Sequence, residues 1–150
     1  MRWMCGRQGV SSQWVDDHLW QGTGKSRGGA IFLTDQRDFA IKDIGFFLNH
    51  VQMDGGAIYL LNCRNITIQH CVFFFNFAKW GGGIYLEKCS NVKICGNKFV
   101  LNYAKRDGGA ISLSHCEHVS LWKNQFLFNI GLRSCNEVDL LDCNGVQQEA

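Results

Sequence analysis

Acidic and histidine side chains are the residues of this chain that could act as acid and base in catalysis. Carboxylates held close together would provide general acid and base groups, or oxygen ligands for calcium. Only Asp54 and Asp107 fall at equivalent positions of the repeat described below, where Arg27 and Trp80 occupy the same position in other copies. The other candidates are dispersed along the chain: Asp35, Asp38, Asp43, His50, His70, His115 and His118. The sequence therefore predicts no catalytic site, and we expect the protein not to be an enzyme.

Eight cysteines raise the questions of metal binding and disulfide formation. They fall mainly into two columns of the repeat. We expect one column to hold Cys63, Cys89 and Cys116, with Cys135 continuing it in a last coil that is eight residues shorter, and the other to hold Cys71 and Cys143. No C-x-x-C motif occurs and no histidine pairs with a cysteine at ligand spacing, so no metal site and no cofactor are predicted. Two interpretations stay open: disulfides between neighbouring coils, or thiols that pack as small apolar side chains.

Composition excludes several classes of protein. The 150 residues are 46% hydrophobic and 19% charged with a formal net charge of +2, which is not the composition of a disordered tail. The basic residues are scattered, so no nucleic-acid partner is expected. No apolar run approaches the roughly 20 residues that span a bilayer. The first residues also lack the apolar core of a secretory signal.

A sequence repeat provides the framework that would position these side chains. Gly-Gly-Ala-Ile begins at Gly28, Gly55 and Gly108, and Gly-Gly-Gly-Ile begins at Gly81, with steps of 27, 26 and 27 residues. Phe-x-x-Asn keeps the same step, at Phe46–Asn49, Phe73–Asn76, Phe99–Asn102 and Phe126–Asn129. Two motifs in register over four copies predict a solenoid, in which each repeat packs only against its neighbours.

The apolar columns of the repeat show that each copy is extended rather than helical. Neighbouring columns are two residues apart, as in Ile58 and Leu60 or Phe73 and Phe75, which is the period of a strand. This spacing places Leu48, Phe75, Leu101 and Phe128 on the same face as the preceding phenylalanines. The predicted fold is an all-β, single-stranded parallel β-helix, right-handed by the crossover rule, with about five coils of 26–27 residues. We assign residues 1–27 to an N-terminal cap or degenerate coil, 28–130 to the repeats, and 131–150 to a degenerate terminal coil and tail.

Two further sets of columns suggest a structural and a functional role. Stacked amides at a corner of the coil would satisfy backbone groups along the axis, which predicts a ladder of Asn49, Asn76, Asn102 and Asn129. Apolar residues should also face outward in two rows, each with one residue per coil. The first row, on the strand before the asparagine corner, consists of Phe47, Phe74, Val100 and Leu127. The second, on the strand after the glycine pair, consists of Phe32, Tyr59 and Tyr85 and ends at Ser112. Such rows favour an interaction surface, or a surface covered by the chain's own terminal segment.

The repeat resembles that of the chlamydial polymorphic outer membrane proteins, whose repeats carry GGA[ILV] and FxxN. Gly28–Ile31, Gly55–Ile58 and Gly108–Ile111 match the first motif, and the four Phe-x-x-Asn segments match the second. The similarity covers roughly residues 19–130. It implies a non-enzymatic adhesin-like module at the cell surface or outside the cell, which binds a protein or glycan partner, or a second copy, through its lateral face. Two alternatives are a carbohydrate-binding or polysaccharide-degrading β-helix and an intracellular β-helix scaffold.

Overall fold

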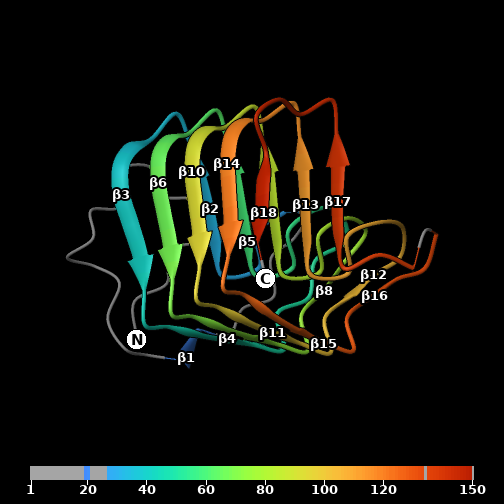
Figure 1. Cartoon of the computed structure of the whole chain (residues 1–150). Helices are drawn as coiled ribbons and strands as arrows, with labels where there is room; N and C mark the ends of the chain where they lie inside the picture. The colour runs from blue at the N-terminus through green and yellow to red at the C-terminus, as the bar shows by residue number, and fades with distance from the viewer. Residues whose placement is uncertain (1–18, 21–26, 134, 150) are drawn as a thin grey trace.

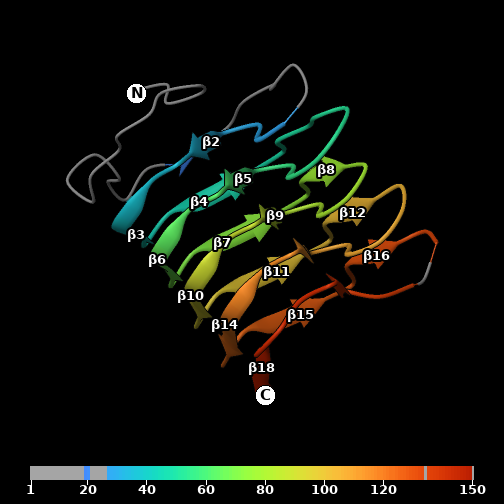
Figure 2. The ribbon, with the colours of Figure 1, turned by 90° about the horizontal axis from the view of Figure 1, so that it is seen from above.

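The computed structural model describes residues 19–20, 27–133 and 135–149 of the chain. Within these residues every regular element is a β-strand, and the chain winds through successive coils whose strands stack in parallel (Figures 1 and 2). Matched strands of neighbouring coils pair at the predicted step, as Ile58 does with Ile84 and Phe73 with Phe99. The prediction of an all-β parallel β-helix is therefore confirmed.

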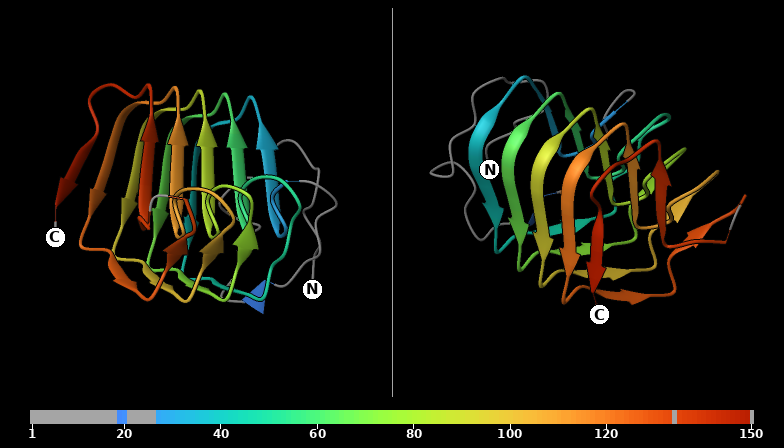
Figure 3. Two further views of the ribbon diagram at one scale, coloured as in Figure 1. Left: turned by 90° about the vertical axis from the view of Figure 1, so that its right-hand side faces the viewer. Right: turned by 45° about the horizontal axis from the view of Figure 1, so that its top comes forward.

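Sheet I follows the repeated glycine pairs. In its first four strands, the isoleucine that begins each strand and the leucine two residues later point inward and are buried, while the residue between them faces the outside of the coil. Figure 3, left, shows its strands side by side in the order β17-β13-β9-β5-β2. These strands are β2 (Ile31–Thr34), β5 (Ile58–Leu61), β9 (Ile84–Glu87), β13 (Ile111–Ser114) and β17 (Val138–Leu141).

Three further sheets complete each coil. Sheet II consists of β3 (Arg37–Lys42), β6 (Arg64–Gln69), β10 (Ser90–Cys95), β14 (Glu117–Trp122) and β18 (Gln147–Glu149). Sheet III consists of β1 (Leu19–Trp20), β4 (Gly45–Phe47), β7 (Val72–Phe74), β11 (Lys98–Val100) and β15 (Gln125–Leu127). Sheet IV is small and holds β8 (Phe77–Ala78), β12 (Tyr103–Ala104) and β16 (Ile130–Gly131). Sheet IV lies in the loops that project from the coil and return to the glycine pairs (Figure 2).

The core is a set of apolar columns that run along the axis inside the coil. Phe46, Phe73 and Phe99 are fully buried and stack with ring centroids 4.8 and 4.6 Å apart. Gly82 shows how closely neighbouring coils approach one another where the chain turns back to sheet I. A Cβ atom at this position would lie 2.2 Å from the carbonyl oxygen of Gly109, so a glycine is required there.

The side chains of Leu48, Phe75, Leu101 and Phe128 do not face the core as the column spacing predicted. Each has a backbone φ of 55 or 56° and lies in the turn after a strand of sheet III. This left-handed conformation ends the alternation of the strand, so these four side chains point into solvent and are exposed. The prediction of an inward column was therefore wrong at these positions.

The number of coils and the register of the last coil also differ from the predictions. The described residues form four complete coils, and β17 and β18 continue sheets I and II into an incomplete fifth. Ile111 pairs with Val138 at the ordinary step of 27 residues, so the last coil is not shortened. Cys143 rather than Cys135 consequently lies next to Cys116, whose backbone amide donates to its Sγ atom over 3.4 Å. Apart from β1 and Arg27, the proposed N-terminal cap lies outside the described residues.

Candidate functional site: two outer surfaces

The four asparagines of the Phe-x-x-Asn motif form a buried ladder at the corner after sheet III. The side-chain amide of Asn76 donates to Oδ1 of Asn102 over 2.9 Å and to the carbonyl oxygen of Phe46 over 3.0 Å. Oδ1 of Asn76 accepts from both the backbone and the side-chain amide of Asn49. Asn129 extends the ladder in the next coil. This corner positions the residues on either side of it.

A second asparagine ladder, which the sequence analysis did not single out, lies at the corner before sheet III. Asn97 donates to Oδ1 of Asn124 over 3.1 Å and to the carbonyl oxygen of Ile68 over 3.0 Å. Its own Oδ1 accepts from the backbone amide of Cys71. Of the strands of sheet III, β11 and β15 are thus held at both ends by amide side chains, which fixes the direction of the side chains between them.

The outer side of sheet III carries the predicted apolar row. Phe47 and Phe74 are half-buried against each other, with ring centroids 5.8 Å apart, and Val100 is half-buried beside them. Leu127 ends the row and is 48% exposed. The row is therefore accessible along its whole length in the described part of the chain.

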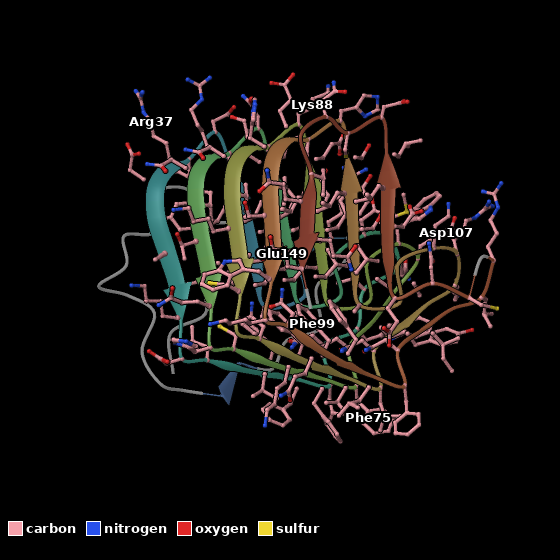
Figure 4. All side chains as sticks on the ribbon, viewed as in Figure 1. Arg37, Phe75, Lys88, Phe99, Asp107 and Glu149 are labelled. Atoms are coloured by element: carbon pink, nitrogen blue, oxygen red, sulfur yellow. The ribbon has the colours of Figure 1, made fainter. Side chains whose placement is uncertain are left out.

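Two more apolar rows adjoin this one and continue it around the corner. The turn contributes Leu48, Phe75, Leu101 and Phe128, of which Phe75 is 49% and Phe128 is 75% exposed. Sheet IV contributes Phe77, Tyr103 and Ile130 from its outer side, and the rings of Phe77 and Tyr103 stack 5.0 Å apart. We call these three rows together the apolar face. Figure 4 shows Phe75 projecting from the underside of the coil, opposite the interior position of Phe99.

The apolar face contains a hollow at the corner. Phe75, Leu101 and Phe128 form one side of this hollow, and Phe77, Tyr103 and Ile130 form the other, around a volume of about 430 Å³. The buried amides of Asn76 and Asn102 form its floor. Charged groups lie at its edge rather than inside it, since the Lys105 ammonium is 5.5 Å from the centre of the Phe77 ring.

The second predicted row, on the outer side of sheet I, is a stack of rings rather than a free surface. Phe32, Tyr59 and Tyr85 are nearly parallel, with centroid separations of 5.2 and 5.4 Å. Tyr59 is 0% exposed, because the flanking rings and the guanidinium of Arg27, 5.2 Å from its ring centre, cover it. The expectation that Tyr59 belongs to an exposed interaction surface was wrong.

A groove with a volume of about 650 Å³ lies over this side of sheet I, between its strands and the loops that precede the glycine pairs. Four carboxylates line it, contrary to the expectation of dispersed acidic residues: Asp54, Glu87, Asp107 and Asp139. Figure 4 shows Asp107 on the loop side of the coil, away from Phe75. The turns bring Asp54 and Asp107 to the groove, while the strands contribute Glu87 and Asp139. We call this feature the carboxylate groove.

Polar contacts hold the four carboxylates in place. Oδ2 of Asp54 accepts from Nε of Arg27 over 3.2 Å, and the Tyr59 hydroxyl donates to Oε2 of Glu87 over 2.5 Å. Burial raises the pKa of Asp54. Burial and, to a smaller extent, the neighbouring Asp107 raise the pKa of Asp139. Both shifts disfavour the ionised carboxylate, so the groove is poorly suited to additional negative charge.

The cysteines that the structure describes are all free thiols. Cys63, Cys89 and Cys116 are buried in one column, and burial raises the pKa of Cys71 to about 12. Within the described ranges, no cluster of three or more histidine, cysteine or acidic side chains has the geometry of a metal site. In this structure, the buried thiols pack as small apolar side chains.

Comparison with known proteins identifies the family. Residues 9–132 match the family described as the right handed beta helix region, so the chain belongs to this family. No curated protein and no solved structure matches the chain significantly. Among the described residues, no helix is long and apolar enough to cross a membrane. The family defines the architecture, and the two outer surfaces are the features from which a function can be argued.

Proposed function

We propose that this β-helix is a non-enzymatic binding module that presents its apolar face to a protein partner. The observation that carries the proposal is the continuous exposed apolar surface on sheet III, the following turn and sheet IV. Full burial of one such side chain stabilises a complex by about 1.5–3 kcal/mol, so a few residues at the centre of the face are enough to anchor a partner. The resemblance to a family of adhesins supports a location at the cell surface.

The four turn residues strengthen this proposal because their side chains do not favour their backbone conformation. The left-handed conformation costs a branched or aromatic residue roughly 1–2 kcal/mol, and glycine or asparagine adopts it more easily. Leu48, Phe75, Leu101 and Phe128 nevertheless occupy these positions and are 36–75% exposed, so their burial offsets only part of the cost. A contribution to binding explains these residues better than a contribution to folding.

The carbohydrate alternative is favoured by one observation, the carboxylates that share the groove over sheet I. Paired carboxylates are the groups that glycosidic bond cleavage requires. The apolar face contains no such pair, and its hollow has a predominantly apolar lining. An assay for release of reducing ends from polysaccharides, with Glu87→Gln as its control, tests this alternative separately from partner binding.

Photo-crosslinking in the cells that produce the protein tests the proposal directly. A photoreactive residue at Phe75 should yield a reproducible adduct, whereas the same residue at the exposed Lys93, on sheet II, should not. The mass of the adduct distinguishes a second copy of the chain from another protein. Loss of the Phe75 adduct when Leu101→Asn is introduced alongside shows that the face acts as one surface.

Stability measurements distinguish partner binding from coverage by the chain itself. Because asparagine tolerates a positive φ, Leu101→Asn should leave the melting temperature of the isolated protein unchanged or raise it slightly. If the chain's own terminal segment covers the face, the same substitution should lower the melting temperature. Identical adducts from Phe75 and Lys93, or none from either, would show that the apolar face binds no partner.

A further inference from the structure

The carboxylate groove lies on a different part of the coil from the apolar face, and its chemistry differs. We propose that this groove is a second binding site, which takes an alkylammonium or guanidinium group of a polyamine or of a basic peptide. The cation would lie against the ring of Tyr85 and between the carboxylates of Glu87, Asp107 and Asp139. This proposal does not depend on the function of the apolar face.

The aromatic stack of sheet I leaves one ring face without an aromatic neighbour. Phe32, Tyr59 and Tyr85 follow one another in paired strands, but the residue paired with Tyr85 in the next coil is Ser112. The half-buried ring of Tyr85 is therefore stacked on Tyr59 on one side and faces a small side chain on the other. Since the face of an aromatic ring attracts cations, the end of the stack is suited to a cationic group.

The chain itself binds a guanidinium in the same groove, one coil earlier. Arg27 lies 5.2 Å from the centre of the Tyr59 ring, and its Nε atom donates to Oδ2 of Asp54 over 3.2 Å. A tyrosine ring and a carboxylate thus already hold one cation. Tyr85 and Asp139 offer the same two kinds of group in a different arrangement, because Asp139 lies in the row of Tyr85 itself, two coils further along and beyond Ser112.

The charged side chains that line the groove are mainly acidic. Among the described residues, its lining contains four carboxylates and two cationic side chains, those of Arg27 and Arg133, while Lys79 and Arg106 lie beside it on the ring of Trp80. Arg133 lies at the edge, 67% exposed, and its Nη1 atom is 3.8 Å from Asp107, which is a long distance for an ion pair. The side chain of Asp54 is only 6% exposed, and its Oδ1 atom has no hydrogen-bond partner. An unpaired buried carboxylate oxygen is costly, and a nearby cation would reduce that cost.

A neutral sugar fits these observations less well. Stacking of a sugar ring requires a broad aromatic face, and Trp80 is the largest aromatic residue in the groove. Its ring already contacts two cations, because the Lys79 ammonium and the Arg106 guanidinium lie 4.6 and 5.4 Å from its centre. The aromatic surface left for a ligand is that of Tyr85, where the carboxylates gather.

Calorimetric titration of the whole chain tests this site. The probes are spermine, a glycine-flanked arginine peptide and the neutral tetrasaccharide maltotetraose. We expect at least one cationic probe to bind, and Asp139→Asn to weaken its binding about tenfold, as loss of a charge-assisted contact does. Removal of the ring face by Tyr85→Leu should weaken it about threefold to tenfold. Asp43→Asn changes the charge equally at an exposed position outside the groove, and should alter affinity less than about twofold.

A change in the opposite direction provides a second check. Arg133→Gln removes the cation at the edge of the groove and should strengthen binding of the cationic probe. Comparison of spermine with the arginine peptide shows whether the groove binds an ammonium or a guanidinium group, and binding of either one supports the site. Binding of maltotetraose alone would replace the proposal with a carbohydrate site. Equal weakening by Asp43→Asn and Asp139→Asn, or binding of no probe, would overturn it.

Discussion

At the scale of single residues, one turn of this coil places adjacent side chains in opposite environments. Phe75 has a positive φ and is exposed, whereas Asn76 is fully buried and bonded to the coils on both sides. The asparagine ladder supplies the hydrogen bonds that the turn backbone cannot make with itself. It thereby holds the exposed row in place.

Replacement of Asn76 by alanine tests the ladder. The change removes the acceptor of the Asn49 amides and the donor to the Phe46 carbonyl, all of which are buried. We expect the free energy of unfolding to fall by about 1–3 kcal/mol, the cost of leaving such groups unpaired. Denaturant titration measures this loss. Gln125→Ala, an exposed amide on β15, should change stability by less than about 0.5 kcal/mol, and an equal loss in both variants would contradict the ladder.

At the scale of elements, the strands of sheet III are only two or three residues long and depend on aromatic stacking for their packing. Phe73 lies between Phe46 and Phe99, while Phe126 ends the stack and is half-buried. The same residue type therefore occurs in the same column with two different degrees of packing.

This difference predicts unequal costs for the same substitution. Phe73→Ala would leave a cavity between two rings and should lower the free energy of unfolding by about 3–5 kcal/mol. Phe126→Ala removes a ring that stacks on Phe99 alone among the described rings and is only partly buried against the core, so its cost should be at most half as large. Denaturation of both variants under identical conditions compares them. Equal losses would show that the stack does not carry the packing of sheet III.

The strands could be predicted from the sequence because their alternation and their repeat are local patterns. The outward direction of Leu48 and its equivalents could not be predicted. A strand that continues and a strand that ends at a residue in the left-handed conformation have the same spacing of apolar residues in the sequence. Apolar side chains are also rare at such positions, so the ordinary turn signals of glycine and asparagine were missing. The predicted row from Phe47 to Leu127 needed no such information.

The carboxylate groove was missed for a related reason. Asp139 reaches the groove only because the last coil pairs Val138 with Ile111. The cysteine pattern had suggested a shortened coil, which places Asp139 on another sheet. Glu87 was detectable, since it lies two residues after Tyr85 and faces the same side, but the sequence does not show that the loop of Asp54 lies opposite. Contacts across two coils depend on register, and a single error in register hides them.

At the scale of the whole molecule, the two proposed sites occupy separate sides of a stack of coils, and each coil adds similar contacts along the axis. The outer rows of sheets III and IV form the apolar face, and the outer side of sheet I forms the carboxylate groove (Figure 3). Each coil contributes one layer to both surfaces and contacts only the coils next to it. A ligand that spans several coils would therefore lose contacts layer by layer as coils are removed.

Deletion of one coil in register tests this additivity. Removal of residues 77–102 joins Asn76 to Tyr103. Since Tyr103 pairs with Phe77 in the neighbouring coil, it takes the place of Phe77 and the register of the strands is kept. We expect this shorter chain to keep its β-sheet circular dichroism and cooperative unfolding, with a lower melting temperature because one interface between coils is lost. Removal of residues 77–96 deletes fewer residues but takes out β8, β9 and β10 while it leaves both β7 and β11. Two strands of sheet III then follow each other with no strands of sheets IV, I and II between them, so the chain cannot close a coil there. That chain should not unfold cooperatively, although it is longer. If the 77–96 deletion folds as well as the 77–102 deletion, the repeat length does not determine how the coils stack.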